Sequence, residues 1–207
     1  MHQVHGPSSG LYAITPADWP AQKLLAAVDE ALTAGLRRLQ YRAKPQPDES
    51  VARQLLARCR RAGAQLIIND DVVLAARIGA DGVHVGRDDG DLAAIRRQAG
   101  DGLIVGASCY NDLERARRLA QAGADELAFG SVHASPTKPD AVHCPLDVLT
   151  QARELGRPVI AIGGIVVGNA AAVISAGADW LAVGSALFSA ADIGATTRQF
   201  QELFASS

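Results

Sequence analysis

The sequence predicts an α/β fold, a single (β/α)8 barrel of the TIM type, and three observations lead to that prediction. A phrase made of Gly-Ala-Asp, an apolar run and a closing glycine occurs at 79–86, 123–130 and 177–184. Short apolar segments alternate with helical patterns along the chain. The chain has 207 residues, 48% of them hydrophobic, which is ample for one core. A doubly wound open sheet is the alternative, but it normally has fewer strands and an early nucleotide loop.

In each copy of the repeat, the leading glycine is placed to end a helix in a left-handed conformation, and the apolar residues are typical of a buried parallel strand. The predicted strands are Leu11–Thr15, Leu36–Tyr41, Gln65–Ile68, Gly82–Val85, Leu103–Ala107, Glu126–Phe129, Val159–Ile162 and Trp180–Val183. The helices predicted between them include Ala21–Thr33, Glu49–Ala62, Leu113–Gln121 and Ala170–Ala176, and a closing helix lies within Ile193–Phe204. We expect residues 1–9 to form a flexible tail and residues 10–207 to form the one barrel domain.

Charge and composition exclude several classes of protein. The net charge is −2, from 20 basic and 22 acidic residues, and no basic run indicates a nucleic-acid partner. No stretch resembles a signal peptide or a membrane span, so we expect a cytoplasmic protein without a membrane partner. Cys59, Cys109 and Cys144 have no metal-binding spacing, which favours reduced, mostly buried thiols.

Active sites of such barrels lie at the carboxyl ends of the strands. Strand 2 is followed by two cations, Arg42 and Lys44, which alternate with the amide of Gln40 and suit a phosphate or diphosphate. A solvated strand end is the alternative.

Acidic residues follow strands 3 and 4, in Asn69-Asp-Asp71 and in Arg87-Asp-Asp89. Either group could cap the next helix. Two acidic strand ends beside a cationic one also suit Mg²⁺, which binds one or two carboxylates plus substrate phosphates. His84 is expected to point into the barrel core or a helix interface, and Asn111 or Asp112 to cap the helix after strand 5.

Glycine-rich ends follow strands 7 and 8, and they let backbone N–H groups approach an anion. The loop after strand 6 carries Ser135, Thr137 and Lys138, and Lys138 is one of only three lysines in the chain. The mouth is therefore predicted to hold two anion subsites, for two phosphorylated substrates.

Six motifs, in order and over nearly the whole chain, are similar to thiamine-phosphate synthases. They are Gln40-x-Arg-x-Lys44, Leu66–Asp70, Asp81–Gly86 with Asp89, Ser108–Asn111, Ser135–Lys138 and Ile162–Ile165. The chain departs from the family pattern at Pro16, at Arg87-Asp-Asp89, at His133-Ala134, after Ile165 and at Gly184-Ser185, and the last three departures lie in the thiazole half.

The resemblance implies a transferase that joins hydroxymethylpyrimidine diphosphate to a thiazole phosphate, with Mg²⁺ as cofactor and a homo-oligomer as one possible assembly. It implies pyrimidine diphosphate binding by Gln40, Tyr41, Arg42, Ala43, Lys44, Asn69 and Ser108. It implies thiazole phosphate binding by Ser135, Pro136, Thr137, Gly164, Gly184 and Ser185, with Lys138 at the leaving diphosphate. Asp70 and Asp89 would bind the metal, and Lys138, Arg42, Lys44 and Ser108 would take the catalytic roles.

Two other functions stay open. A thiazole tautomerase-like isomerase resembles this barrel but has a histidine where this chain has Tyr110, and it has no use for a diphosphate and metal set. A non-catalytic sensor of phosphate ligands is the other alternative.

Overall fold

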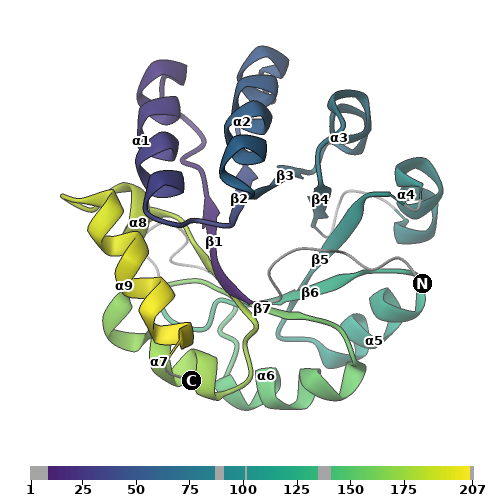
Figure 1. Ribbon diagram of the computed structural model, residues 1–207. Helices are drawn as coiled ribbons and strands as arrows, with labels where there is room; N and C mark the ends of the chain where they lie inside the picture. The colour runs from purple at the N-terminus through teal and green to yellow at the C-terminus, as the bar shows by residue number, and fades with distance from the viewer. Residues whose placement is uncertain (1–8, 87–90, 101, 135–140, 206–207) are drawn as a thin grey trace.

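The computed structural model describes residues 9–86, 91–100, 102–134 and 141–205 (Figure 1). The strands are β1 (Gly10–Ile14), β2 (Arg38–Tyr41), β3 (Gln65–Asn69), β4 (Gly82–Val85), β5 (Ile104–Tyr110), β6 (Glu126–Phe129), β7 (Val159–Ile162) and β8 (Trp180–Val183). The helices are α1 (Ala21–Thr33), α2 (Glu49–Ala62), α3 (Val72–Ile78), α4 (Leu92–Ala99), α5 (Leu113–Gln121), α6 (Leu146–Ala152), η1 (Arg153–Leu155), α7 (Val167–Ser175), α8 (Ser185–Phe188) and α9 (Ile193–Ala205).

The strands form a closed parallel barrel in sequence order, with β8 paired to β1. The helices lie around the outside of this ring (Figure 1). The predicted barrel is confirmed, and the open-sheet alternative is wrong because the ladder has no free edge. No helix in the described ranges is long and apolar enough to cross a membrane.

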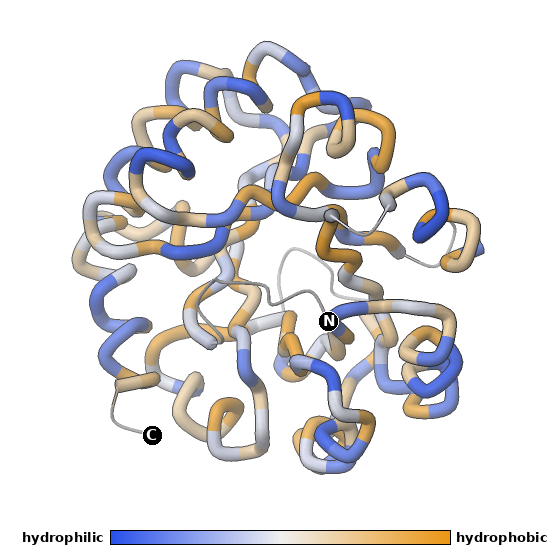
Figure 2. Tube along the Cα trace, turned by 45° about the vertical axis from the view of Figure 1, so that its right-hand side comes forward, coloured by the Kyte–Doolittle hydropathy of each residue, from blue (hydrophilic) through white to orange (hydrophobic). Residues whose placement is uncertain are grey.

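The core has two layers, because successive side chains of a strand point to opposite faces. The larger layer joins outward-facing strand residues to the helices, and Figure 2 shows apolar colour in the central strands and alternating with hydrophilic colour along the helices. A smaller apolar cluster fills the barrel itself. Its buried members are Tyr12, Ile67, Ala128, Ile160, Trp180 and Ala182.

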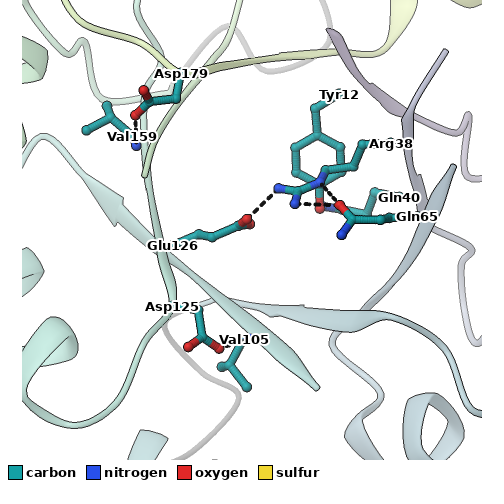
Figure 3. A network of polar contacts seen from close by, with 9 residues as sticks. All are labelled: Tyr12, Arg38, Gln40, Gln65, Val105, Asp125, Glu126, Val159 and Asp179. Carbon is teal, nitrogen blue, oxygen red and sulfur yellow. Dashed lines mark hydrogen bonds and ion pairs between the residues drawn. The ribbon is translucent and has the colours of Figure 1, made fainter. Parts of the chain in front are cut away.

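The aspartates of the repeated phrase join neighbouring strands. Each one accepts a hydrogen bond from the backbone N–H of a residue in the preceding strand, and its own N–H donates to that residue's carbonyl. The pairs, with their N–O carboxylate distances, are Asp81 with Leu66 (2.7 Å), Asp125 with Val105 (2.8 Å) and Asp179 with Val159 (2.7 Å). Figure 3 shows the last two. The repeat therefore encodes a pair of hydrogen bonds that links the start of β4, β6 and β8 to the preceding strand. Its leading glycines have positive φ, as the helix-ending role requires.

A polar group lies at the amino-terminal end of the barrel interior, and we call Arg38, Gln65 and Glu126 the polar floor (Figure 3). Arg38 Nη1 is 2.5 Å from Glu126 Oε1, and its Nε and Nη2 donate to Gln65 Oε1 at 2.9 and 2.6 Å. The guanidinium also stacks over the Trp180 ring, 4.0 Å from its centroid. Every charge on the floor therefore has a partner, as burial requires.

Most predicted elements are confirmed to within two residues at each end, but two differ by three residues. The helix predicted at Ala170–Ala176 is α7, which begins at Val167 and ends at Ser175. The fifth strand extends three residues beyond the predicted Ala107 and ends at Tyr110, because its ladder with β6 continues across an irregularity at Ser108–Tyr110. Asp91 is the cap of α4, because its side chain accepts from the first N–H groups of that helix, and Arg87–Asp89 lies outside the described residues. Asp71 and Asp112 cap α3 and α5, as expected.

Candidate active site

Three predicted residues lie toward the carboxyl ends of β2, β3 and β5 on the inner face of the barrel. Gln40 lies near the end of β2, Asn69 ends β3, and Ser108 lies in β5. The β3–β4 and β4–β5 registers pair Asn69 with His84 and His84 with Gly106, and Ser108 lies two residues beyond Gly106 on β5. The structure therefore brings the predicted amides and hydroxyl to one mouth.

One predicted cation, Lys44, and one predicted carboxylate, Asp70, meet at this mouth. Lys44 Nζ is 3.8 Å from Asp70 Oδ2, and the two side chains are 56% and 38% exposed. Asp70 has φ of 65°, a left-handed conformation that aspartate tolerates better than most residues. Its N–H donates to the His84 carbonyl at 2.8 Å. The backbone thus holds the carboxylate beside the cationic end of β2.

The Arg42 backbone is fixed by a residue that the sequence did not single out. Thr15 Oγ1 accepts from the Arg42 N–H at 2.8 Å and donates to the Arg42 carbonyl at 2.9 Å. Thr15 is buried, and Lys44 N–H donates to the Ala17 carbonyl at 3.2 Å. The end of strand 1, which had no assigned role, therefore continues the ladder past the end of β2.

Gln40 is fixed from inside the barrel. Its Nε2 donates to the Tyr12 hydroxyl at 2.9 Å, and both residues are buried (Figure 3). Burial raises the pKa of Tyr12 far above its ordinary value, so the phenol stays protonated in any ordinary buffer. Tyr12 was not predicted as a site residue, because the strand-1 sequence alone does not indicate which strand faces it.

Two predicted residues of the same segment point elsewhere. Tyr41 is buried in the outer layer, and its hydroxyl accepts from the Asp48 N–H at 3.2 Å. Ala43 packs partly against that layer. Both border a hollow of about 250 Å³ between the β2 end and the start of α1 and α2, which Arg42 and Lys44 also line. Only the backbones of Tyr41 and Ala43 are near the inner mouth.

The loop after β6 lies against the loop after β7. His133 N–H donates to the Gly163 carbonyl at 3.1 Å, and Ser131 pairs through its backbone with Val142 and Cys144. His133 Nε2 is buried and has no hydrogen-bond partner within the described residues. Ser135, Pro136, Thr137 and Lys138 lie outside the described residues, as does Asp89.

Gly163 and Gly164 are required by this close approach. A Cβ on Gly163 would lie 2.0 Å from Ser131 Oγ, and one on Gly164 would lie 2.4 Å from the Ala134 carbonyl oxygen. Both glycines have positive φ. The predicted binding residue Gly164 therefore keeps its backbone against the stem of the lysine-bearing loop.

The strand-8 end places the other two predicted residues next to a short helix. Gly184 precedes α8 and Ser185 begins it. On the neighbouring loop, the Asn169 side chain accepts from the Val166 N–H at 2.9 Å and donates to the Gly164 carbonyl at 3.0 Å. This is a capping arrangement of α7, and it supports the backbone of the Gly-Gly turn.

The β4–β5 side of the mouth holds two side chains in contact. His84 points into the barrel, as expected, and its Nε2 is 2.9 Å from Ser108 Oγ. Arg115, which was not predicted, donates from Nε to the Ser108 carbonyl at 2.9 Å and contacts the Gly86 carbonyl at 3.4 Å. Arg115 therefore joins the backbones of two adjacent strand ends.

The cysteines are buried and unpaired, as predicted. Burial raises the pKa of Cys59 and of Cys109 to about 12, and that of Cys144 to about 11. A thiol that stays protonated is a poor nucleophile. The expected inert role of Cys109 agrees with these surroundings.

The predicted magnesium set is compatible with the part of the mouth that is described. Within the described residues no three His, Cys, Asp or Glu side chains form a metal-binding group. Mg²⁺ needs no such cluster, since one or two carboxylates with substrate phosphates and water complete its octahedron. Asp70 offers a half-exposed carboxylate beside Lys44, which has the oxygen chemistry that Mg²⁺ prefers.

Comparison with known proteins gives one consistent family. A family model described as thiamine monophosphate synthase matches residues 11–187. A thiamine-phosphate synthase of Methylobacillus flagellatus is 51% identical over 201 residues, covering 96% of each chain. One of Bordetella pertussis is 50% identical over 200 residues, covering 92% of each. Among solved structures, a thiamine phosphate pyrophosphorylase from Pyrococcus furiosus superposes with a TM-score of 0.87 at 32% identity, covering 97% of each chain.

Proposed function

The chain belongs to the thiamine monophosphate synthase family, whose members are transferases, and on that premise we propose its substrates and mechanism. It joins 4-amino-2-methyl-5-hydroxymethylpyrimidine diphosphate to a thiazole phosphate, in the carboxylated or the hydroxyethyl form. It releases thiamine phosphate and pyrophosphate, together with carbon dioxide where the thiazole is carboxylated. The observation that carries the proposal is the cationic end of β2 beside the Asp70 carboxylate, with Lys44 Nζ 3.8 Å from Asp70 Oδ2. Such a pairing suits a diphosphate and its counter-cation.

With the hydroxyethyl thiazole phosphate the proposed reaction breaks one bond and forms one, and with the carboxylated form the bond from the ring to the carboxylate breaks as well. The bond between the pyrimidine methylene carbon and the diphosphate oxygen breaks with both electrons staying on oxygen. The thiazole nitrogen then bonds to the methylene carbon through a loose, cation-like transition state. Negative charge grows on the departing oxygens, so Arg42, Lys44 and Lys138 stabilise that state more than the bound substrates.

The remaining residues bind and orient. Gln40, Asn69 and Ser108, from β2, β3 and β5, present an amide, an amide and a hydroxyl to the pyrimidine half. The phosphate of the thiazole half is held by Ser135, Pro136 and Thr137 with the backbones of Gly164, Gly184 and Ser185. Alignment of two rings in one mouth supplies the entropic part of the acceleration.

Magnesium fits this scheme at Asp70 and Asp89. When bound there it supplies positive charge to the diphosphate oxygens, which makes the diphosphate a better leaving group. No protein nucleophile takes part, in keeping with the protonated, buried thiols.

The test is release of pyrophosphate by the purified protein. We expect release only when the pyrimidine diphosphate, a thiazole phosphate and Mg²⁺ are all present. Isomerisation of the thiazole without pyrophosphate release would replace the proposal with a tautomerase. Binding of each ligand with a raised melting temperature and no turnover would replace it with a sensor.

Two substitutions test the assigned roles. Asp70→Asn keeps the left-handed backbone that Asn also tolerates but removes the charge, and Lys138→Ala removes the leaving-group cation. Each should abolish most pyrophosphate release without unfolding the protein. Asp71→Asn is the matched control, because Asn also caps a helix well and Asp71 only caps α3. Lys23→Ala, on α1, is the control for Lys138. Near-normal rates in both test variants would refute the roles.

The proposal also covers the setting of the enzyme. Its substrates are small phosphorylated molecules, and neither nucleic acid nor membrane takes part. We propose a cytoplasmic location, which fractionation of cells can test, and sedimentation can determine whether it forms a homo-oligomer.

A further inference from the structure

We propose that His84 is a positioning residue that fixes the Ser108 hydroxyl at the barrel mouth. The inference deepens the proposed function and rests on it, because Ser108 is there the hydroxyl that meets the pyrimidine substrate. His84 Nε2 lies 2.9 Å from Ser108 Oγ, a normal hydrogen-bond distance.

The contact between His84 and Ser108 joins two adjacent strands, β4 and β5. His84 lies on β4 opposite Gly106 of β5, and Ser108 is the next inward position on β5. The imidazole therefore crosses from its own strand and passes over Gly106 to reach the hydroxyl. The histidine does not touch the proposed pyrimidine site in this role; it acts through Ser108.

Gly106 supplies the second observation. A Cβ at Gly106 would lie 2.8 Å from His84 Nδ1 and 3.7 Å from Cγ and Cε1. Real Cβ atoms do not approach other atoms so closely, so any larger residue at 106 would push the ring away. Gly106 has no positive φ, which leaves the space for His84 as the reason for glycine there.

A fixed hydrogen-bond partner determines whether a serine hydroxyl donates to a ligand or accepts from it. The hydroxyl has one proton and rotates freely when unpartnered. If His84 Nε2 carries a proton, the imidazole donates and the Ser108 proton is left to donate to substrate. If Nε2 is bare, the serine donates to it and Oγ can only accept from substrate. In either tautomer the hydrogen bond between His84 and Ser108 restricts rotation of the Ser108 hydroxyl before substrate binds.

The Ser108 backbone is fixed separately. Arg115 Nε donates to the Ser108 carbonyl at 2.9 Å. The main chain is therefore held by α5 and the side chain by β4, so loss of His84 should free the hydroxyl without moving the strand.

A double-mutant cycle tests this role. His84→Asn, Ser108→Ala and the double variant are compared by kcat/KM for the pyrimidine diphosphate in pyrophosphate release. We expect His84→Asn to lower it about two- to thirteenfold, the range that one neutral hydrogen bond supports. On the Ser108→Ala background the same change should have no further effect, because coupled residues are not additive. Equal factors on both backgrounds would overturn the proposal.

Two further variants separate positioning from folding. His84→Gln should recover much of the loss, because its amide nitrogen reaches near the place of Nε2 whereas that of asparagine falls nearer Nδ1. Gly106→Ala should reproduce the His84→Asn loss with both polar residues intact, while Gly102→Ala, where a Cβ meets open space, should not. A Gly106→Ala enzyme with normal kcat/KM would refute the geometry.

A readout independent of turnover keeps the two proposals apart. The imidazole ¹⁵N chemical shift of His84 Nε2 should change between the wild-type protein and Ser108→Ala. An unchanged shift overturns the His84–Ser108 contact, whatever the activity. A changed shift in a protein that releases no pyrophosphate overturns the proposed function and leaves the contact standing.

Discussion

Replacing Arg38 with methionine should destabilise the barrel strongly, because it leaves a buried carboxylate without its partner. The Arg38 and Glu126 side chains are 3% and 7% exposed, and their closest atoms are 2.5 Å apart. Arg38 also donates twice to Gln65 Oε1. Breaking a buried pair on one side costs about 3–5 kcal/mol. For a domain of this size, that is a fall in melting temperature of about 6–20 °C.

The pH dependence of this variant follows from Glu126. Burial raises the pKa of Glu126 above its usual range, and Arg38 opposes that shift. Without Arg38 the pKa rises further. A folded-state pKa above the unfolded value means that stability is greatest below the unfolded pKa and is lost as the pH rises through the folded one. The destabilisation by Arg38→Met should therefore be larger near neutral pH than in mild acid.

Urea unfolding followed by circular dichroism measures both effects. The double variant Arg38→Met/Glu126→Leu should recover most of the stability, because it removes the orphaned charge. Arg53→Met is the exposed control: its partner Glu49 is 2.8 Å away on the surface of α2, and the change should cost under about 1 kcal/mol. A loss for Arg38→Met below about 1 kcal/mol, or one independent of pH, would refute the reasoning.

Three further predictions test other parts of the structure. Gly163→Ala places a Cβ against Ser131 at positive φ and should lower the free energy of unfolding by more than about 2 kcal/mol. The control Gly168→Ala, in open space on α7, should raise it by about 0.5–1 kcal/mol. Equal melting temperatures of the two variants would contradict this. Tyr12→Phe keeps the ring but leaves the Gln40 amide without its acceptor, so urea unfolding should show a loss of about 1–3 kcal/mol, and no loss would exclude the bond. The cysteine thiols, with pKa values of about 11 or 12, should react with Ellman's reagent near neutral pH only as the protein unfolds; immediate labelling of native protein would contradict their burial.

The fold was predictable from the sequence where burial alone sets the strand limits. β4, β6, β7 and β8 begin and end as predicted, because each is a short, mostly apolar run between an aspartate or proline and a glycine. β5 differs because Ser108 and Tyr110 are held in the strand by the ladder with β6 rather than by an apolar environment. Hydrophobicity gives no signal for such an extension.

The sequence predicted the site residues one strand end at a time. The side chains that hold them in place come from other strands and could not be predicted in this way, because they are brought together only by the closed barrel. Thr15 contacts Arg42 across 27 positions in the sequence, and His84 reaches Ser108 across 24. No local sequence pattern predicts a contact between residues so far apart in the chain. Which residues face each other follows from the register of neighbouring strands, and a single sequence does not contain that register.

The inner face of β2 shows how stability and the candidate site depend on the same residues. Arg38 and Gln40 are successive inward positions of this strand, one on the polar floor and one at the mouth. Tyr12 lies between them: its ring is 5.5 Å from the Arg38 guanidinium carbon, and its hydroxyl accepts from Gln40 (Figure 3). The floor therefore fixes the ring whose hydroxyl orients the Gln40 amide. It follows that changes at the floor should alter the mouth even where the barrel remains folded.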